Sequence, residues 1–130
     1  MQKTTLFCLF SLLMASTAPL THAAEKILVI AHRGDSAHFP ENTLSAFRSA
    51  VAKRADLVEL DSHATKDGTL VVLHDATLDR TTSAKEVFGV TGVALAAKEW
   101  DKIKDLDAGA WKDPKFKGER LPTLEDSLKT

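Results

Sequence analysis

Apolar and polar residues follow a strand, helix and strand pattern in the first half of the chain. Residues 27–31 form a short, apolar, β-branched run that predicts a buried strand. A helix is expected next, with Asn42 as its N-cap. This helix is expected to end near residues 53–54. Its apolar residues share one face: Leu44, Ala46, Phe47, Ala50 and Val51. With an alternating strand at residues 56–61, this order predicts a βαβ unit with parallel strands and a right-handed crossover.

A hairpin signal follows the second strand. The Asp67-Gly68 pair predicts a two-residue turn, and residues 70–73 are the returning strand. Counting back from that turn places His74 opposite Asp61, and directly opposed residues share a face of the sheet. We therefore expect His74 to lie beside the acidic end of the preceding strand.

The pattern becomes irregular beyond residue 80, where glycines interrupt it. One amphipathic helix is expected there from apolar residues at helical spacing: Leu95, Trp100, Ile103 and Leu106. A last helix is expected to begin after its cap, Thr123.

The amino terminus has the order of a secretory signal peptide. Lys3 gives a basic start, residues 6–13 are apolar apart from one serine, and small residues lead to Ala23. The apolar run is well short of the ~20 residues that a membrane-spanning helix needs. We therefore predict a signal peptide over residues 1–23 and an exported protein, periplasmic or secreted, with no stable membrane anchor. The alternative is an uncleaved anchor or a buried helix.

The composition excludes several classes of function. The 130 residues include 17 Lys and Arg against 18 Asp and Glu, so the chain lacks the basic excess that favours nucleic acid or an anionic membrane. A single Cys excludes an intrachain disulfide framework and a cluster of thiolate ligands. What remains is one globular domain, or a piece of a larger one.

Two carboxylates stand out on the second predicted strand. Glu59 and Asp61 are two positions apart, so their side chains project from the same face. Carboxylates on one buried face repel each other unless a cation or protons intervene, and a hard cation such as Ca²⁺ or Mg²⁺ suits oxygen ligands. An exposed acidic strand face explains the pattern equally well.

Histidines and an arginine lie at the ends of the same strands. His32 and Arg33 follow the first strand, and His74 follows the third extended segment. Active sites of parallel α/β folds lie at the carboxyl ends of strands. An arginine, a metal and two imidazoles suit hydrolysis of a phosphodiester, since they clamp the phosphate, neutralise charge and move protons. His63 is expected to be a solvent-facing strand residue.

A series of short motifs runs in order through the chain: His32-Arg33-Gly34, Glu41-Asn42-Thr43 with Ala46-Phe47, Glu59-Leu60-Asp61, Thr65-Lys66-Asp67-Gly68, His74-Asp75, Arg80-Thr81-Thr82 and Leu121-Pro122-Thr123-Leu124-Glu125. Each motif is weak by itself, but the ordered set is specific. Over about residues 27–128, it closely resembles the glycerophosphodiester phosphodiesterase family.

The resemblance implies a (β/α)₈ TIM barrel of the phospholipase C-like phosphodiesterase type. Only the first strands and a family insertion, at about residues 81–120, would lie in this chain. Residues 24–130 would then be the amino-terminal part of the phosphodiesterase domain, since a typical barrel needs ~250 residues. The family's third metal-binding carboxylate comes from a later strand, and we expect it beyond residue 130.

The resemblance also assigns roles to particular residues. It implies that His32 and His74 are the general acid/base pair and that Arg33 binds the phosphate. Glu59 and Asp61 would bind the divalent cation, Ca²⁺ or Mg²⁺. The remaining residues of the implied site would support it: Glu41 and Asn42. The implied substrate is a small-molecule glycerophosphodiester, cleaved to glycerol 3-phosphate and an alcohol through a cyclic phosphate intermediate.

Two interpretations from different classes stay open. The chain is either the amino-terminal section of a phosphodiesterase or a truncated, non-catalytic fragment of one. The first class also includes two related enzymes that share the same barrel. These are a phospholipase D-type sphingomyelin-cleaving enzyme and a phosphoinositide phospholipase. The Glu41-Asn42-Thr43 triplet and the predicted insertion favour the glycerophosphodiesterase. The sequence does not predict the oligomeric state.

Overall fold

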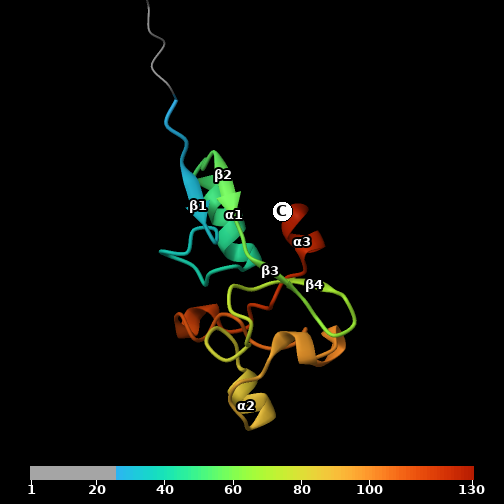
Figure 1. Ribbon diagram of the computed structural model, residues 1–130. Coiled ribbons are helices and arrows are strands. Elements are labelled where there is room, and N and C mark those ends of the chain that lie inside the picture. The colour runs from blue at the N-terminus through green and yellow to red at the C-terminus, as the bar shows by residue number, and fades with distance from the viewer. Residues whose placement is uncertain (1–25) are drawn as a thin grey trace, which may run out of the picture.

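The computed structural model describes residues 26–130, and the predicted signal peptide over residues 1–23 lies outside the described residues. The strands and α-helices are β1 (Ile30–His32), α1 (Leu44–Ala52), β2 (Leu57–Glu59), β3 (Ser62–Ala64), β4 (Leu70–Val72), α2 (Ala84–Phe88) and α3 (Leu124–Leu128). Three short 3₁₀ helices lie between α2 and α3: η1 (Leu95–Ala97), η2 (Trp100–Lys102) and η3 (Pro114–Phe116). Figure 1 shows β1, β2 and α1 at one end of the described chain and α2 at the other, with the β3–β4 hairpin between them.

β1 and β2 form a parallel pair joined by α1, so the predicted βαβ order is confirmed. Ala31 pairs with Val58, and His32 pairs with Glu59. The carboxyl ends of the two strands therefore lie side by side, which brings the polar residues that follow each strand to one edge.

The N-cap of α1 is Thr43, and the prediction of Asn42 is wrong. Thr43 has the extended backbone that an N-cap requires, and its Oγ1 accepts a hydrogen bond from the Ala46 amide at 3.3 Å. Asn42 instead has a left-handed backbone, with φ of 58°. Its side chain points away from the helix and donates to Asp61.

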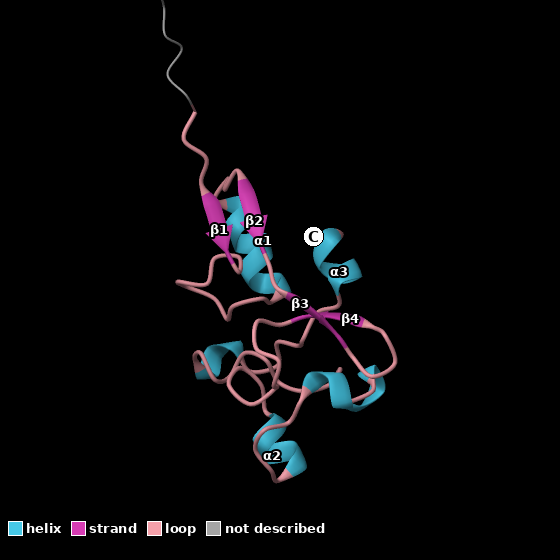
Figure 2. Cartoon of the chain, in the orientation of Figure 1, coloured by secondary structure: helices cyan, strands magenta, loops and turns pink. Residues whose placement is uncertain are grey.

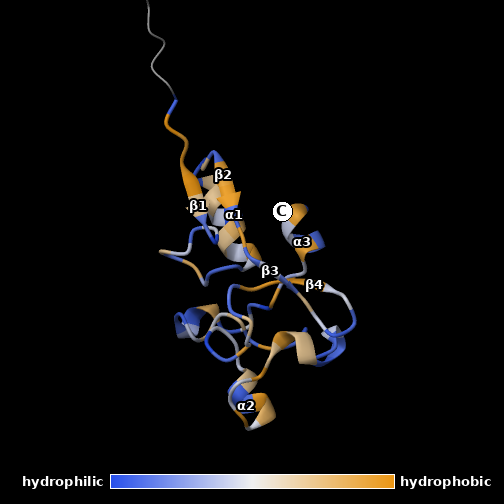
Figure 3. Cartoon of the chain, in the orientation of Figure 1, coloured by the Kyte–Doolittle hydropathy of each residue, from blue (hydrophilic) through white to orange (hydrophobic). Residues whose placement is uncertain are grey.

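The prediction of a buried first strand is also wrong. β1 begins only at Ile30, and the four residues 27–30 are each more than half exposed. Figure 3 shows this run as a hydrophobic stripe leading into β1. α1 packs on the strands through its buried face of Ala46, Phe47 and Ala50, and no described residue buries the opposite side of the strand pair. Val51, expected on the apolar helix face, is exposed as well.

β3 and β4 form the predicted antiparallel hairpin, but its turn is one residue longer than expected. The Thr65 amide donates to the Thr69 carbonyl at 2.9 Å, which leaves residues 66–68 as the loop. The Thr65 hydroxyl closes this loop, since it accepts from the Thr69 amide at 2.9 Å and donates to Asp67 at 2.6 Å. Gly68 supplies the left-handed residue that a three-residue hairpin loop uses, with φ of 84°.

The longer turn shifts the strand register by one residue. Ser62 pairs with Val72, and the Leu73 amide donates to the Asp61 carbonyl at 3.0 Å. Leu73 therefore takes the position opposite Asp61, and the prediction that His74 lies there is wrong. A shift of one residue reverses the face that each side chain meets. His74 is thus not a cross-strand partner of the acidic pair.

The main hydrophobic core lies between β4 and the segment that follows it, where loops connect the short helices (Figure 2). Its buried members are Val71, Leu73, Leu78, Ala84, Val93, Leu95, Ile103, Leu106, Ala108 and Leu121. The single amphipathic helix expected here is not formed. Lys98 and Glu99 have extended backbones and separate η1 from η2. The apolar residues that predicted this helix nevertheless reach the core, with Trp100 packed at its margin.

The last helix, α3, begins where the sequence predicts. Thr123 is its N-cap, and the Thr123 Oγ1 accepts from the Asp126 amide at 3.0 Å. The segment before it is tied to β4, because the Val72 amide donates to the Pro122 carbonyl at 2.9 Å. Among residues 26–130, no helix combines the length and apolar character needed to cross a membrane.

Candidate functional site

The ends of β1 and β2 place His32 next to Glu59. The two residues are register partners, and His32 Nε2 lies 4.0 Å from Glu59 Oε2. The Arg33 amide donates to the same carboxylate oxygen at 2.9 Å. The His32 side chain is 67% exposed and that of Glu59 is 38% exposed, so both remain accessible to a small molecule.

A tight turn after β1 directs Arg33 toward the acidic residues. Arg33 has φ of 58°, which is uncommon for a non-glycine residue and is found at strained functional positions. Gly34 follows with φ of 76°, and a Cβ there would lie 2.8 Å from Ala46 atoms and 2.9 Å from the Phe47 ring. The Asn42 amide closes the turn by donating to the Arg33 carbonyl at 3.1 Å. Only glycine lets this turn pack so closely on α1.

The Arg33 guanidinium lies between two carboxylates. Its Nη1 donates to Glu41 Oε1 at 3.0 Å, and its Nε lies 3.4 Å from Asp61 Oδ2. Arg33 Nε is buried and has no hydrogen-bond partner within the described part of the chain. The side chain is only 18% exposed, so its planar cation is held in one orientation.

Asn42 and Asp61 hold each other through both side chain and backbone. Asn42 Nδ2 donates to Asp61 Oδ2 at 3.0 Å, and Asn42 Oδ1 accepts from the Asp61 amide at 3.4 Å. Asn42 is buried. Because the carboxamide is fixed at both ends, it sets the orientation of the Asp61 carboxylate, as a supporting residue would.

Glu59 and Asp61 supply part of a set of oxygen donors that suits a hard cation. Arg33 contacts both carboxylates through Glu59 Oε2 and Asp61 Oδ2. The other oxygen of each accepts no hydrogen bond from residues 26–130. Oxygen donors fit Ca²⁺ or Mg²⁺, but either cation takes at least six ligands. No group of three or more His, Cys, Asp and Glu residues that could hold a metal occurs in this described range. These two carboxylates thus fit the cation as a partial ligand set.

A second charged network joins His74 to Glu41. His74 Nδ1 lies 2.7 Å from Asp75 Oδ1, and Arg80 donates to both Asp75 oxygens at 2.7 and 2.9 Å. The other edge of the Arg80 guanidinium donates to both Glu41 oxygens, at 2.8 and 3.1 Å. The hydrogen bonds from Arg80 lower the pKa of Asp75 and of Glu41, and those carboxylates raise the pKa of Arg80.

The sequence assigned no role to Asp75, Arg80 or His63. The available signals were an acidic residue directly after His74 and an arginine five positions further on. His63 is half-buried, so its interpretation as a solvent-facing residue is wrong. Its Nε2 donates to the His74 carbonyl at 3.0 Å, because a carbonyl oxygen can only accept.

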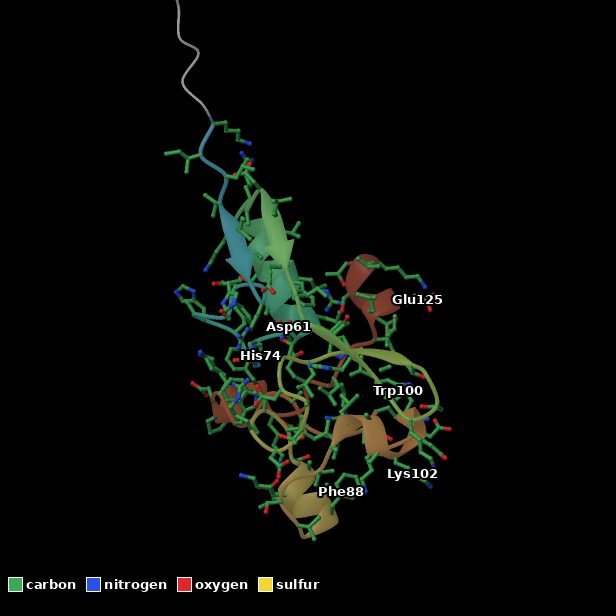
Figure 4. The ribbon with its side chains drawn as sticks, viewed as in Figure 1. Asp61, His74, Phe88, Trp100, Lys102 and Glu125 are labelled. Atoms are coloured by element: carbon green, nitrogen blue, oxygen red, sulfur yellow. The ribbon has the colours of Figure 1, made fainter. Side chains whose placement is uncertain are left out.

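One continuous set of contacts connects the candidate residues. Glu41 Oε1 is the junction, because both Arg33 and Arg80 donate to it. From this junction, contacts lead to the remaining members of the set: His32, Asn42, Glu59, Asp61, His74 and Asp75. Figure 4 shows Asp61 and His74 in neighbouring parts of the molecule, near the junction of the βαβ unit and the hairpin. The structure thus brings the predicted residues together through ion pairs, hydrogen bonds and the pairing of β1 with β2.

Comparison with known proteins identifies close relatives. The glycerophosphodiester phosphodiesterase of Caldanaerobacter subterraneus subsp. tengcongensis is 52% identical over 99 residues, which are 76% of this chain and 38% of that protein. The glycerophosphodiester phosphodiesterase of Bacillus subtilis is 41% identical over 112 residues, or 80% of this chain and 36% of that protein. This chain therefore spans less than half the length of these relatives.

The solved structures that resemble this chain are also phosphodiesterases. The glycerophosphodiester phosphodiesterase of Agrobacterium tumefaciens superposes with a TM-score of 0.72 at 39% identity, covering 80% of this chain and 42% of that one. A phosphodiesterase of Oleispira antarctica, solved with its product sn-glycerol-3-phosphate, gives a TM-score of 0.69 at 36% identity, with 79% and 39% covered.

The fold expectation is confirmed, because these structures are (β/α)₈ barrels. This chain corresponds to only part of such a barrel. The sequence model of the Glycerophosphoryl diester phosphodiesterase family matches residues 32–130, a range that begins at His32 and includes every candidate site residue named above. The chain belongs to the glycerophosphoryl diester phosphodiesterase family.

Proposed function

We propose that the protein is a metal-dependent phosphodiesterase that cleaves glycerophosphodiesters into glycerol 3-phosphate and an alcohol. The observation that carries this proposal is the continuous set of contacts joining His32, Arg33 and Glu59 at the strand ends to His74, which follows β4. The product bound to the Oleispira antarctica relative supports a substrate of this class. The substrate is a small molecule, and the two imidazoles and one guanidinium match its single phosphodiester.

Glu59 and Asp61 are the proposed protein ligands of a divalent cation, Ca²⁺ or Mg²⁺. Asn42 and the Arg33 amide orient these carboxylates through the hydrogen bonds described above. When bound, the cation polarises a phosphoryl oxygen and offsets the charge that develops during hydrolysis. Arg33 then orients a second non-bridging oxygen of the phosphate with its planar guanidinium.

His32 and His74 divide the proton transfers of the proposed reaction. In the first step, one imidazole accepts the proton of the glycerol hydroxyl that attacks phosphorus, while the other donates a proton to the departing alkoxide. This step gives a cyclic phosphate and the free alcohol. In the second step, water opens the cyclic phosphate and the two imidazoles exchange roles. One P–O bond is thus hydrolysed by one water, and both imidazoles return to their starting states.

The activity is tested with a full-length protein, which here means one that includes the rest of the barrel. The assay measures the release of glycerol 3-phosphate from glycerophosphocholine. Glu59→Gln and Asp61→Asn should each lower turnover and weaken cation binding in calorimetry, because ligand charge sets affinity for a hard cation. Glu125→Gln, a change on exposed α3, is the matched control. If both ligand variants keep full turnover and full sensitivity to a chelator, the metal assignment is wrong.

The same assay separates the alternative functions. Turnover by the 130-residue chain alone would show that it needs no further residues, whereas activity only in a longer protein would identify this chain as a non-catalytic fragment. Sphingomyelin and phosphatidylinositol should be hydrolysed far more slowly than glycerophosphocholine. A preference for either lipid would replace the glycerophosphodiesterase proposal with a related activity on the same barrel.

A further inference from the structure

Arg80 occupies an unusual place between the two halves of the site. Its Nε and Nη2 donate to Asp75, while its Nη1 and Nη2 donate to Glu41, so one guanidinium forms a bidentate pair with each carboxylate. Glu41 also accepts from Arg33. Arg80 is therefore the link between the His74–Asp75 pair and the Arg33 turn.

We propose that Arg80 is a positioning residue, which acts through Asp75 to hold the His74 imidazole in the tautomer with its proton on Nδ1 and with Nε2 available to the substrate. The inference rests on the proposed role of His74 in proton transfer. It assigns Arg80 no contact with the reacting atoms.

The tautomer follows from the donors and acceptors around Asp75. Asp75 Oδ1 receives a hydrogen bond from Arg80 Nη2 at 2.9 Å and lies 2.7 Å from His74 Nδ1. An ionised carboxylate can only accept, and Arg80 favours that state by lowering the pKa of Asp75. His74 Nδ1 must therefore be the donor. In the neutral ring, Nε2 is then the nitrogen with the free lone pair.

The planar shape of Arg80 matters as well as its charge. A lysine at this position keeps the positive charge but cannot form a bidentate pair with two carboxylates at once. Without Arg80, Asp75 is free to rotate about its side-chain bonds, and the His74 ring loses its fixed partner. The backbone of His74 keeps a separate anchor, because His63 Nε2 still donates to its carbonyl at 3.0 Å.

The experiment measures the His74 tautomer and turnover separately in the full-length protein. Imidazole ¹⁵N shifts, assigned by the signal missing from His74→Ala, report which ring nitrogen carries the proton in the neutral state. Arg80→Ala and Arg80→Lys should each mix the tautomers and lower kcat by about 10–100-fold, the range for a residue that orients another functional group. KM should change little, and millimolar guanidinium should partly restore kcat in Arg80→Ala. Arg48→Ala is the matched control, since Arg48 is exposed on α1.

Asp75→Asn provides the second variant. An amide can turn its NH₂ toward Nδ1 and so favour the opposite tautomer, which should lower kcat by about 10²–10⁴-fold. Three results would overturn the inference: an unchanged His74 tautomer in Arg80→Ala, a full recovery in Arg80→Lys, or a raised KM with normal kcat. None of these affects the proposed function. Normal turnover in well-folded His74→Ala, by contrast, would remove the proposed function and this inference together.

Discussion

The His32 imidazole and the Glu59 carboxylate face each other across the parallel β1–β2 pair, with Nε2 4.0 Å from Oε2. The two residues are register partners at the carboxyl ends of their strands, so their proximity follows from backbone pairing. His74 reaches the same site by a different route, through Asp75, Arg80 and Glu41. One proposed proton carrier is thus positioned by a sheet and the other by ion pairs.

Removing either histidine should abolish most of the activity of the full-length protein. His32→Ala and His74→Ala should each lower turnover by about 10²–10⁴-fold, the range for a positioned acid or base. The double variant should lose much less than the product of the two losses, because residues that act as a unit are not additive. Wild-type turnover should have a bell-shaped dependence on pH.

His38→Ala is the control for the histidine variants. His38 lies outside the connected set, with its ring beside Asp35 and Lys53, and its side chain is 66% exposed. Turnover should stay within a few-fold of wild type. Thermal unfolding is measured for each variant together with turnover. The comparison distinguishes loss of a catalytic side chain from loss of the folded structure. Near-normal turnover in well-folded His32→Ala or His74→Ala would refute the acid/base assignment.

Asn42 should control cation affinity without binding the cation. Asn42→Gly removes the carboxamide that holds Asp61 and leaves a residue that tolerates the left-handed backbone at φ 58°. Loss of such an orienting partner should weaken cation binding by about 10–100-fold. Titration calorimetry with Ca²⁺ and with Mg²⁺ measures the change. An unchanged affinity would show that Asp61 needs no orientation by Asn42 or is no ligand.

Gly34→Ala should destabilise the protein more than Gly68→Ala, although both glycines have a positive φ. A methyl group at residue 34 meets Ala46 at 2.8 Å, whereas nothing lies within 4 Å at residue 68. Both variants share the left-handed penalty of roughly 1–2 kcal/mol. Overpacking should add about 1–3 kcal/mol to Gly34→Ala alone. Urea unfolding measures both, and equal losses would contradict the close packing of the turn on α1.

Asp35 should make the stability of the protein depend on acid pH. Its carboxylate accepts from Lys53 Nζ and Ser49 Oγ, each at 2.6 Å, and lies 2.8 Å from His38 Nδ1. The hydrogen bond from Lys53 is the main cause that lowers the pKa of Asp35 far below its usual value. A folded-state pKa below the unfolded value of about 3.9 means that the unfolded chain binds more protons at intermediate pH. The stabilisation is therefore complete above about pH 5 and is lost as pH falls through the folded-state pKa.

Asp35→Asn tests this contribution to stability. The variant should be less stable than wild type at neutral pH, and the difference should shrink as the pH is lowered below about 4. Asp105→Asn, a change at an exposed residue, is the matched control. Urea unfolding across the acid range gives the comparison. A constant difference between Asp35→Asn and wild type at all pH values would rule out the linkage.

We propose export with cleavage after Ala23. The basic start, the apolar run and the small residues that precede this position motivate the prediction. Amino-terminal sequencing of protein recovered from the cell envelope should find Ala24 as the first residue. A first residue of Met1 or Gln2 would overturn it.

The sequence by itself determined the strand–helix–strand unit, the hairpin and the start of the last helix, and it nominated the candidate site residues. Apolar runs, the Asp67-Gly68 pair and a capping threonine are local signals. They were sufficient for the strand–helix–strand unit, the hairpin and the cap at Thr123. The motif order was sufficient for the family, since side-chain identity at many spaced positions is specific even where each motif is weak.

Tertiary contacts decided the register, the first helix cap and the linkage of the site. The Thr65 hydroxyl and Gly68 closed a longer loop than Asp67-Gly68 suggested, which a rule for two-residue turns does not anticipate. Asn42 does not cap the helix, because its buried side-chain amide hydrogen-bonds to Asp61, which is distant in sequence. The double pairing of Arg80 likewise depends on Glu41, which is 39 residues away. Such contacts leave no local periodicity, so only the folded chain reveals them.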